Sequence, residues 1–190
     1  MAKREEPAVW EGNVGAWVFQ GNPFRVWRYF DVLKENDLSP GDLYTNTWTL
    51  HPSYRIELMQ PDQLVILWLT GERKKDYWPG VFEIGLLNAP PTPSFGIDET
   101  HKVPGAKPDA SGFAAEFDSY ILPQSLRSAE LRQDPVLAAC EKFRVPMLGN
   151  PLFLTPRETL ALSRYIDPSS LEEAGWDLAL KDDFYVKAVE

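Results

Sequence analysis

The sequence predicts a single α+β domain in which a mixed sheet is flanked by helices. The chain has 190 residues, of which 44% are apolar, and this is enough to bury one core of ordinary size. Its apolar segments follow the order strand, helix, several strands, long loop, strand and then helices. The strands are grouped and do not alternate regularly with helices, so the pattern does not fit a sheet built from repeated βαβ units.

The first two predicted elements are a buried strand and a helix. Residues 16–20 form a short apolar run that ends at Gly21-Asn22-Pro23, a sequence typical of turns. In residues 24–33, apolar side chains recur at the spacing of one helix face. We therefore expect a strand that ends at the turn and a helix that begins directly after it.

Three further strands are predicted in the middle of the chain. Residues 45–50 favour β structure and have Trp48 near their centre. Residues 64–69 are six consecutive apolar residues, which predicts a strand buried on both faces. Residues 81–85 form the next strand, after the polar, lysine-bearing segment 71–79. The last two strands together predict a hairpin with a long, charged connection.

The second half of the chain predicts a loop, a strand and helices. Residues 88–112 are rich in Pro, Gly, Ser and Thr, which is typical of a long loop, and such loops are often functional or mobile. Residues 114–122 alternate apolar and polar residues, as a half-buried strand does, and residues 128–140 have a helical pattern. A second helix is expected from Thr155 to about Tyr165, because it begins with a capping threonine followed by proline and glutamate.

The charge of the chain is negative and uneven. There are 28 acidic and 19 basic residues, which gives a net charge of −9. Residues 167–190 contain 7 of the acidic and 2 of the basic residues, so this segment alone carries −5. A protein that binds a long stretch of nucleic acid does so by neutralising many phosphates with Lys and Arg, and an acidic composition disfavours this kind of binding. Affinity for a nucleic acid would have to come from a pocket.

Several functional classes lack support in the sequence. The chain has one cysteine, Cys140, which predicts a small buried residue, and no His or Cys stands at the spacing of metal ligands. No nucleophile with its base and no phosphate-binding loop is recognisable. We therefore expect no enzymatic activity, no metal and no cofactor. The start of the chain lacks the apolar segment of a signal peptide, and the longest apolar run is too short for a bilayer, which predicts a cytoplasmic protein without a membrane partner.

Several segments in a fixed order carry a family resemblance. They are residues 17–23 (WVFQGNP), 47–50 (TWTL), 61–68 (PDQLVILW), 80–85 (GVFEIG), 126–146 and 151–158 (PLFLTPRE). Together they resemble the EVE domain, a member of the PUA-like superfamily that is related to the YTH domain. The resemblance implies a twisted mixed β-barrel flanked by helices. The sequence departs from the family pattern at Asp62-Gln63, where Gly-Asp is usual, and in the extended loop at 71–79.

The resemblance also divides the chain. It covers residues 15–166 as an EVE-type, PUA-like domain, preceded by an N-terminal extension over residues 1–14. Residues 167–190 form an acidic C-terminal extension outside the match, although Trp176, Leu178, Phe184 and Tyr185 give it side chains with which to dock on the domain.

Similarity to EVE and YTH domains implies a non-catalytic reader of modified nucleic-acid bases. Such a reader binds a base flipped out of its strand in an aromatic pocket, and the ligand expected here is 5-methylcytosine or 5-hydroxymethylcytosine in DNA. The resemblance implies Trp48 as a pocket wall and Asn22 at the base edge. Other residues expected around the base are Thr49, Thr70, Gly71, Tyr77 and Trp78. Cations expected to meet the neighbouring phosphates are Arg25, Arg28, Arg73, Lys74 and Lys75.

Each expectation has an alternative. A core position is the alternative for Trp48, and a purely local turn is the alternative for Asn22. Trp17, Trp27 and Trp68 lie in apolar segments, which favours the core for all three. The alternative functions are an RNA-binding module of the PUA-like type, and a protein-interaction or small-ligand pocket protein. As a DNA reader, the protein would have a separately encoded nuclease or defence protein as a possible partner.

Overall fold

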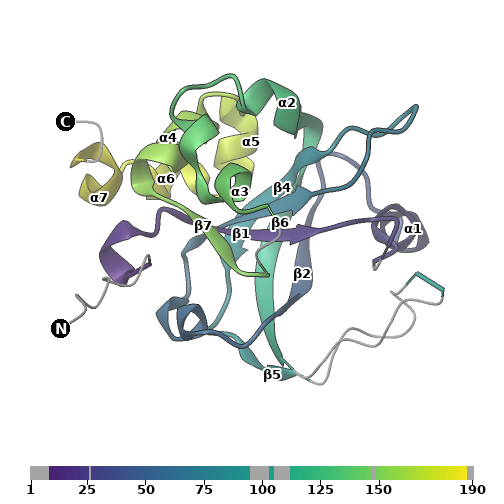
Figure 1. Ribbon diagram of the computed structural model, residues 1–190, viewed down its shortest axis with the longest axis horizontal. Coiled ribbons are helices and arrows are strands. Elements are labelled where there is room, and N and C mark those ends of the chain that lie inside the picture. Colours follow the sequence, from purple (N-terminus) through teal and green to yellow (C-terminus); the bar gives the residue numbers. More distant parts are fainter. Residues whose placement is uncertain (1–8, 26, 95–102, 105–111, 147–148, 188–190) are drawn as a thin grey trace.

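The computed structural model describes residues 9–25, 27–94, 103–104, 112–146 and 149–187. Within them the chain is α+β, as the sequence predicts, with helices packed against a twisted sheet (Figure 1). The strands are β1 (Ala16–Gly21), β2 (Leu43–Leu50), β3 (Leu64–Leu69), β4 (Gly80–Leu87), β5 (Thr92–Ser94), β6 (Gly112–Arg127) and β7 (Leu152–Leu154). The α-helices are α1 (Tyr29–Glu35), α2 (Ser128–Leu131), α3 (Glu141–Arg144), α4 (Pro156–Ser163), α5 (Pro168–Glu173), α6 (Trp176–Ala179) and α7 (Asp183–Val186). Short 3₁₀ helices are η1 (Glu11–Asn13), η2 (Tyr54–Leu58) and η4 (Leu137–Ala139).

The sheet of the described residues is mixed. Its strands follow the order β2-β6-β4-β3-β1-β7, and β5 pairs with β6 beside this path. β1 and β3 run parallel, whereas the other neighbours are antiparallel. β3 and β4 form the hairpin that the sequence predicts. β6 is the longest strand, with 16 residues, and pairs along its length with β2, β4 and β5.

The core lies on both faces of the central strands. All six residues of β3 are buried, and they divide between two apolar clusters by alternation. Val65, Leu67 and Leu69 face a cluster that also contains Trp48. Leu64 and Ile66 face the second cluster, which the helices α2 to α7 cover. Cys140 belongs to this second cluster, and burial raises the pKa of its thiol to about 11.

The strands are not closed into the expected barrel. β2 stands at one end of the strand order and β1 with β7 at the other. β7 pairs with residues 16–18 of β1, so the second half of β1 extends past it. Near their ends, β2 and the segment before β7 are linked by a hydrogen bond from His51 N to Asn150 O, 3.0 Å long. Beyond this link, the indole of Trp48 in β2 lies against Gly21 of β1.

Several elements differ from the sequence expectation at their boundaries. The first helix begins at Tyr29, because Asn22 organises a turn after β1: its side-chain Oδ1 accepts from Phe24 N, and its carbonyl accepts from Arg25 N. The expected loop over 88–112 contains β5, and parts of it lie outside the described residues. The helical region expected over 128–140, with Asp134-Pro135 as a candidate start of a second helical piece, consists of α2 and η4.

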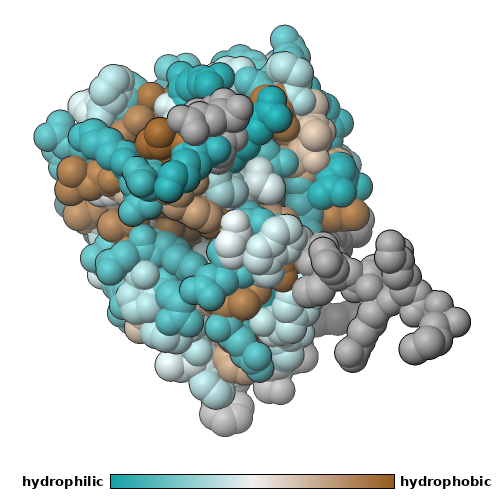
Figure 2. All heavy atoms as spheres, turned by 90° about the vertical axis from the view of Figure 1, so that its left-hand side faces the viewer, coloured by the Kyte–Doolittle hydropathy of each residue, from teal (hydrophilic) through white to brown (hydrophobic). Residues whose placement is uncertain are grey.

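The C-terminal segment packs on the sheet as an integral layer. Trp176 is completely buried, and its Nε1 donates to the carbonyl of Gly85 in β4 at 2.9 Å. The hydroxyl of Tyr185 in α7 donates to the carbonyl of Gly15, just before β1. Apolar side chains are nonetheless scattered among polar ones on the side of the molecule that carries these helices (Figure 2). Leu178 is the most exposed of them, at 72%.

A buried ion pair fixes the segment before β7. The guanidinium of Arg55 in η2 contacts Glu141 through two hydrogen bonds, Nη2 to Oε1 at 2.7 Å and Nη1 to Oε2 at 2.8 Å. The same Nη1 donates to the carbonyl of Pro151 at 2.8 Å. Glu141 Oε2 also accepts from Phe153 N in β7, 3.2 Å away. This cluster joins η2 to α3 and β7, and its Arg55–Glu141 contact links residues 86 positions apart in the sequence.

Two kinds of structural feature are absent from the described residues. No helix among them combines the length and the apolar character that a membrane span requires. No group of three or more His, Cys, Asp or Glu side chains among them is arranged to hold a metal ion.

Candidate ligand-binding pocket

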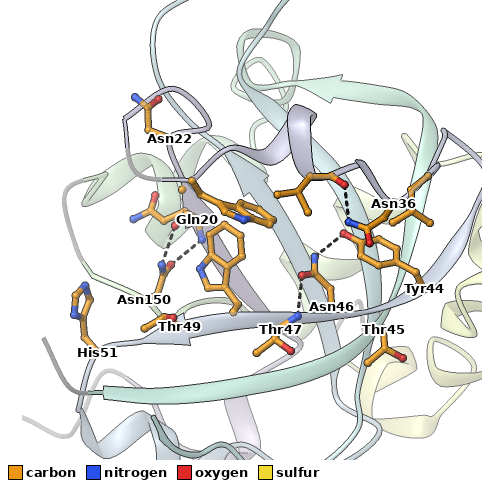
Figure 3. A pocket seen from close by; sticks show the side chains of 15 residues that line it. Gln20, Asn22, Asn36, Tyr44, Thr45, Asn46, Thr47, Thr49, His51 and Asn150 are labelled. Carbon is orange, nitrogen blue, oxygen red and sulfur yellow. Dashed lines mark hydrogen bonds between the residues drawn. The ribbon is translucent and has the colours of Figure 1, made fainter. Parts of the chain in front are cut away.

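The opening between β1 and β2 holds a cavity of about 640 Å³. Its walls are residues 20–22 at the end of β1 and just after it, residues 44–49 of β2 with His51, residues in and beside α1 (Trp27, Val32, Asn36 and Leu38), and Asn150. Figure 3 shows Gln20 and Asn150 at one end and Tyr44 and Asn46 at the other, with Thr47 and Thr49 between them along β2. The cavity therefore lies at the place where a closed barrel would have paired two strands.

Two tryptophans form the aromatic part of the cavity. The rings of Trp27 and Trp48 pack edge to face, with centroids 4.4 Å apart and planes at 81°. Both side chains are largely buried, at 7% and 8% exposed, yet both line the cavity. Sequence reasoning assigned Trp27 to the core, and the structure places it in both the core cluster and the cavity wall. Two rings at nearly a right angle form a corner, against which a flat molecule can lie with one face and one edge.

Gly21 makes room for this corner. A Cβ added at Gly21 would lie 2.7 Å from Cζ2 and 2.9 Å from Cη2 of Trp48, well inside the roughly 3.5–4.0 Å of ordinary carbon contacts. The indole of Trp48 thus rests directly on the backbone of β1. A side chain at position 21 would compete with the ring for the same space.

Substituting alanine at Gly21 is therefore expected to displace the Trp48 indole and to destabilise the fold by about 1–3 kcal/mol, as overpacking does. Urea denaturation and the tryptophan emission spectrum would measure the two effects. Gly12→Ala is the matched control, because a Cβ there would meet the exposed indole of Trp10. Equal stability and equal spectra for Gly21→Ala and the wild type would contradict the assigned contact.

The free edge of β2 supplies backbone hydrogen-bonding groups to the cavity. In an antiparallel pair, successive residues direct their N–H and C=O groups alternately toward the partner strand and away from it. Thr47 N bonds to Asn46 Oδ1 and His51 N bonds to Asn150 O, so these odd-numbered residues point away from β6. By the same alternation, the backbone groups of Thr45 and Thr49 also face the opening.

Asn150 closes one end of the opening, because its side-chain amide pairs with the backbone of Gln20 as a neighbouring strand would. Its side-chain Oδ1 accepts from Gln20 N at 2.7 Å, and its Nδ2 donates to Gln20 O at 2.8 Å. Its own carbonyl accepts from His51 N. Behind this end lies Lys142, whose Nζ donates to Gln20 Oε1. Burial lowers the pKa of the Lys142 ammonium to about 8.

A buried carboxylate stands behind the other end. Glu83 of β4 is fully buried and accepts from four neutral side chains: Tyr29 Oη at 2.6 Å, Tyr44 Oη at 2.9 Å, Asn46 Nδ2 at 3.1 Å and Ser119 Oγ at 2.5 Å. Burial raises the pKa of Glu83, and the four hydrogen bonds oppose that rise. Burial and the nearby Glu83 charge raise the pKa values of the two tyrosines. Tyr44 and Asn46 connect this network to the cavity.

Three of the expected base-binding residues line the cavity. They are Trp48, Thr49 and Asn22. The Asn22 side chain stands apart from the other labelled polar residues in Figure 3, and its Oδ1 is engaged in the turn with Phe24 N at 3.0 Å. Asn22 thus combines a rim position with the local turn role that its Asn-Pro sequence also predicts.

The other four expected base-binding residues lie outside the lining. Tyr77 Oη donates to the carbonyl of Thr70 at 2.8 Å, and the Tyr77 ring packs against Phe24 and Phe82. Thr70 N in turn donates to Gly21 O, and Gly71 lies against the side chain of Asn22. The remaining one, Trp78, is stacked between two guanidinium groups, Arg73 at 3.7 Å and Arg127 at 4.6 Å from its ring. These residues support the turn beside the cavity and do not form a second aromatic wall.

The expected phosphate-binding cations differ in their surroundings. Arg25, Arg73, Lys74 and Lys75 are exposed. The Lys74 ammonium lies 3.5 Å from the ring centre of Phe24, which places it beside the turn after β1. Arg28 is engaged with two carboxylates of its own segment, Asp31 at 3.3 Å and Glu35 at 2.6 Å.

Sequence reasoning missed the polar ends of the cavity. Tyr44 and Asn46 share a strand face with Trp48, because they stand four and two residues before it, and this alternation was a usable signal. Gln20 and Asn150 are 130 residues apart, and no local pattern links them.

Comparison with known proteins gives a fold likeness alone. No family model and no curated protein sequence matches the chain. Among solved structures, a hypothetical protein from Leishmania major is 16% identical, covers 85% of this chain and 97% of its own, and superposes with a TM-score of 0.56. A Rhodopseudomonas palustris protein solved by NMR is 15% identical over 80% and 92% of the two chains (TM-score 0.52), and a Pseudomonas putida protein is 14% identical over 78% and 97% (TM-score 0.50). These likenesses show a shared α+β fold.

Proposed function

We propose that this chain is a non-catalytic reader of modified bases, built as a PUA-like domain of the EVE type. In this proposal a base flipped out of a DNA strand enters the cavity between β1 and β2, and modified cytosine is the ligand. The observation that carries it is the combination of an aromatic corner, Trp27 with Trp48, and a free strand edge in one cavity. The cavity volume, about 640 Å³, falls in the range of roughly 300–1,000 Å³ typical of small-ligand sites.

The energetics of base flipping agree with this arrangement. Extruding a base costs a few kcal/mol of lost stacking and pairing. Stacking on an aromatic side chain returns about 1–3 kcal/mol per base, so one indole face offsets much of that cost. Backbone groups of Thr45 and Thr49 and the amide of Asn46 supply hydrogen-bond partners for the base edge. A 5-methyl group adds only about 1 kcal/mol of transfer free energy, so hydrogen bonds must contribute to the choice of base.

Cations near the rim suit the neighbouring phosphates. Arg25, Lys74 and Lys75 are exposed around the turn after β1 and the β3–β4 connection, which are joined by the bond from Thr70 N to Gly21 O. The net charge of −9 limits the phosphate footprint to such a local group. This short footprint fits a protein that holds one extruded nucleotide, with a separately encoded nuclease or defence protein as its partner in a cytoplasmic setting.

The test is a titration with oligonucleotides that carry cytosine, 5-methylcytosine, 5-hydroxymethylcytosine or N6-methyladenine at one position. Tight binding to one modified base is expected, with a loss of about 10- to 100-fold in affinity for Trp48→Ala, the range that one lost stacking contact gives. Trp48→Phe keeps an aromatic face and should retain part of the affinity. Trp10→Ala is the matched control, because Trp10 is 52% exposed and lies outside the cavity.

Four results would count against the proposal. Equal or absent binding to all four oligonucleotides would remove the reader function, as would a folded Trp48→Ala protein with full affinity. A preference for folded RNA without dependence on modification would favour the alternative RNA-binding module. Mass spectrometry of the recovered oligonucleotides should show them unchanged, and a chemical change would contradict the non-catalytic assignment.

A further inference from the structure

In the hydrogen-bond network behind the cavity, the donor and the acceptor of each bond are fixed by Glu83. A carboxylate has only acceptor sites, so each group that contacts ionised Glu83 must donate to it. Oε1 of Glu83 receives the hydroxyls of Tyr29 and Tyr44, and Oε2 receives Asn46 Nδ2 and Ser119 Oγ. Because Glu83 is fully buried, bulk water does not compete for its hydrogen bonds.

This direction determines what the cavity wall offers to a ligand. The Tyr44 hydroxyl donates to Glu83, and Asn46 Nδ2 donates both to Glu83 and to Tyr44 Oη, at 2.8 Å. The donors of both side chains are therefore turned inward. Each side chain keeps one acceptor site for a ligand: a lone pair on Tyr44 Oη and a lone pair on Asn46 Oδ1. Asn46 Oδ1 lies toward the opening, because it accepts from Thr47 N at the free edge of β2.

We propose that Glu83 is a positioning residue that makes the side chains of Tyr44 and Asn46 an acceptor wall at this end of the cavity, so that the cavity selects a flat ring carrying an exocyclic amino group. The amino group of a cytosine or an adenine would donate to Asn46 Oδ1 and Tyr44 Oη. A ring with a keto oxygen at that place, such as uracil or thymine, would place its own acceptor next to these two acceptors, and no hydrogen bond could form between them. The inference rests on the proposed function and specifies which edge of the base enters first.

The test compares two single-stranded oligonucleotides that differ at one position, 5-methylcytosine or thymine. Both rings carry the same 5-methyl group, and they differ in the amino or keto group at carbon 4 and in the hydrogen on nitrogen 3. We expect 5-methylcytosine to bind about 10- to 100-fold more tightly, the discrimination that a matched pair of hydrogen bonds gives. Fluorescence anisotropy measures both affinities at one salt concentration.

The variant Glu83→Gln tests the role of the buried carboxylate. A glutamine amide has the same shape, but one of its oxygens is replaced by a donating NH2, which forces a hydroxyl or the Asn46 amide to reverse. The ratio of the two affinities should fall toward 1 while circular dichroism and thermal unfolding show a folded protein. Thr159→Ala is the control, because Thr159 is buried and donates to the carbonyl of Thr155, contacts neither Glu83 nor the cavity, and should leave the ratio unchanged. Tyr44→Phe, which removes one wall acceptor and keeps the ring, should also lower the ratio.

The outcomes separate the two proposals. Equal affinity for the two oligonucleotides, with binding that still depends on Trp48, would overturn the acceptor wall and leave the reader function standing. An unchanged ratio in both folded Glu83→Gln and Tyr44→Phe would likewise overturn the positioning role. Absence of binding to every oligonucleotide, N6-methyladenine included, would overturn the reader function and this inference with it.

Discussion

Replacing Glu141 by alanine is expected to lower the free energy of unfolding by about 3–5 kcal/mol, the usual effect of breaking a buried ion pair. The substitution leaves the Arg55 guanidinium buried without its carboxylate, and that side chain is only 10% exposed. It also removes the acceptor of Phe153 N in β7. Urea denaturation at pH 7 measures the loss directly.

Two comparisons make this expectation specific. Glu130→Ala breaks the exposed pair with Arg127, 3.4 Å long, and should change stability by no more than about 1 kcal/mol. The double variant Arg55→Met, Glu141→Leu removes both charges and should recover most of the stability that Glu141→Ala loses. If Glu141→Ala and Glu130→Ala unfold at the same urea concentration, the buried pair does not hold β7 in place.

Trp176→Ala should destabilise the protein by a similar amount, about 3–5 kcal/mol, as truncation of a fully buried tryptophan does. The change leaves a cavity between α6 and the sheet, and it deprives the carbonyl of Gly85 of the indole N–H. Leu178→Ala, two residues along the same helix, is the control, because its side chain is 72% exposed and should contribute within about 0.5 kcal/mol. Thermal unfolding followed by circular dichroism compares the two variants.

A small effect of Trp176→Ala would mean that the C-terminal helices merely rest on the domain. A large effect makes residues 167–187 part of the cooperative unit. The sequence describes this segment chiefly by its acidity, but Ser170 and Ala174 are buried four residues apart, the spacing of one helix face, and the buried Trp176 follows the left-handed Gly175. Charge alone was therefore a poor guide to its structural role.

The strands were the most predictable part of the fold. β3 was visible because six consecutive apolar residues suit a strand that is buried on both faces, and β1 ended at its Gly-Asn-Pro turn as expected. The first helix was predicted too early because helical spacing also continues through the turn that Asn22 organises. Barrel closure could not be judged from sequence, since it depends on how far β7 follows β1.

The candidate site was predictable where it follows strand alternation. Trp48 was assigned to the pocket through the family resemblance, and Asn46, two residues before it on β2, could have been found from strand alternation. Tyr77 was expected at the pocket because it lies in the β3–β4 connection, but its hydroxyl and ring are engaged with the neighbouring turn. The contributions of Glu83 and Asn150 arise from contacts between distant strands, which a single sequence does not encode locally.

The open side of the sheet has a consequence for how the molecule behaves in crowded solution. Unpaired strand edges ordinarily recruit strands from other copies of a protein and so begin aggregation. Here the unpaired edge of β2 faces the cavity, which the indoles of Trp27 and Trp48 and the end of β1 also line. A flat ligand of the proposed kind would lie beside the rings in the cavity, whereas an extended peptide would meet both rings. We therefore expect this edge to be a poor site for self-association through strand pairing.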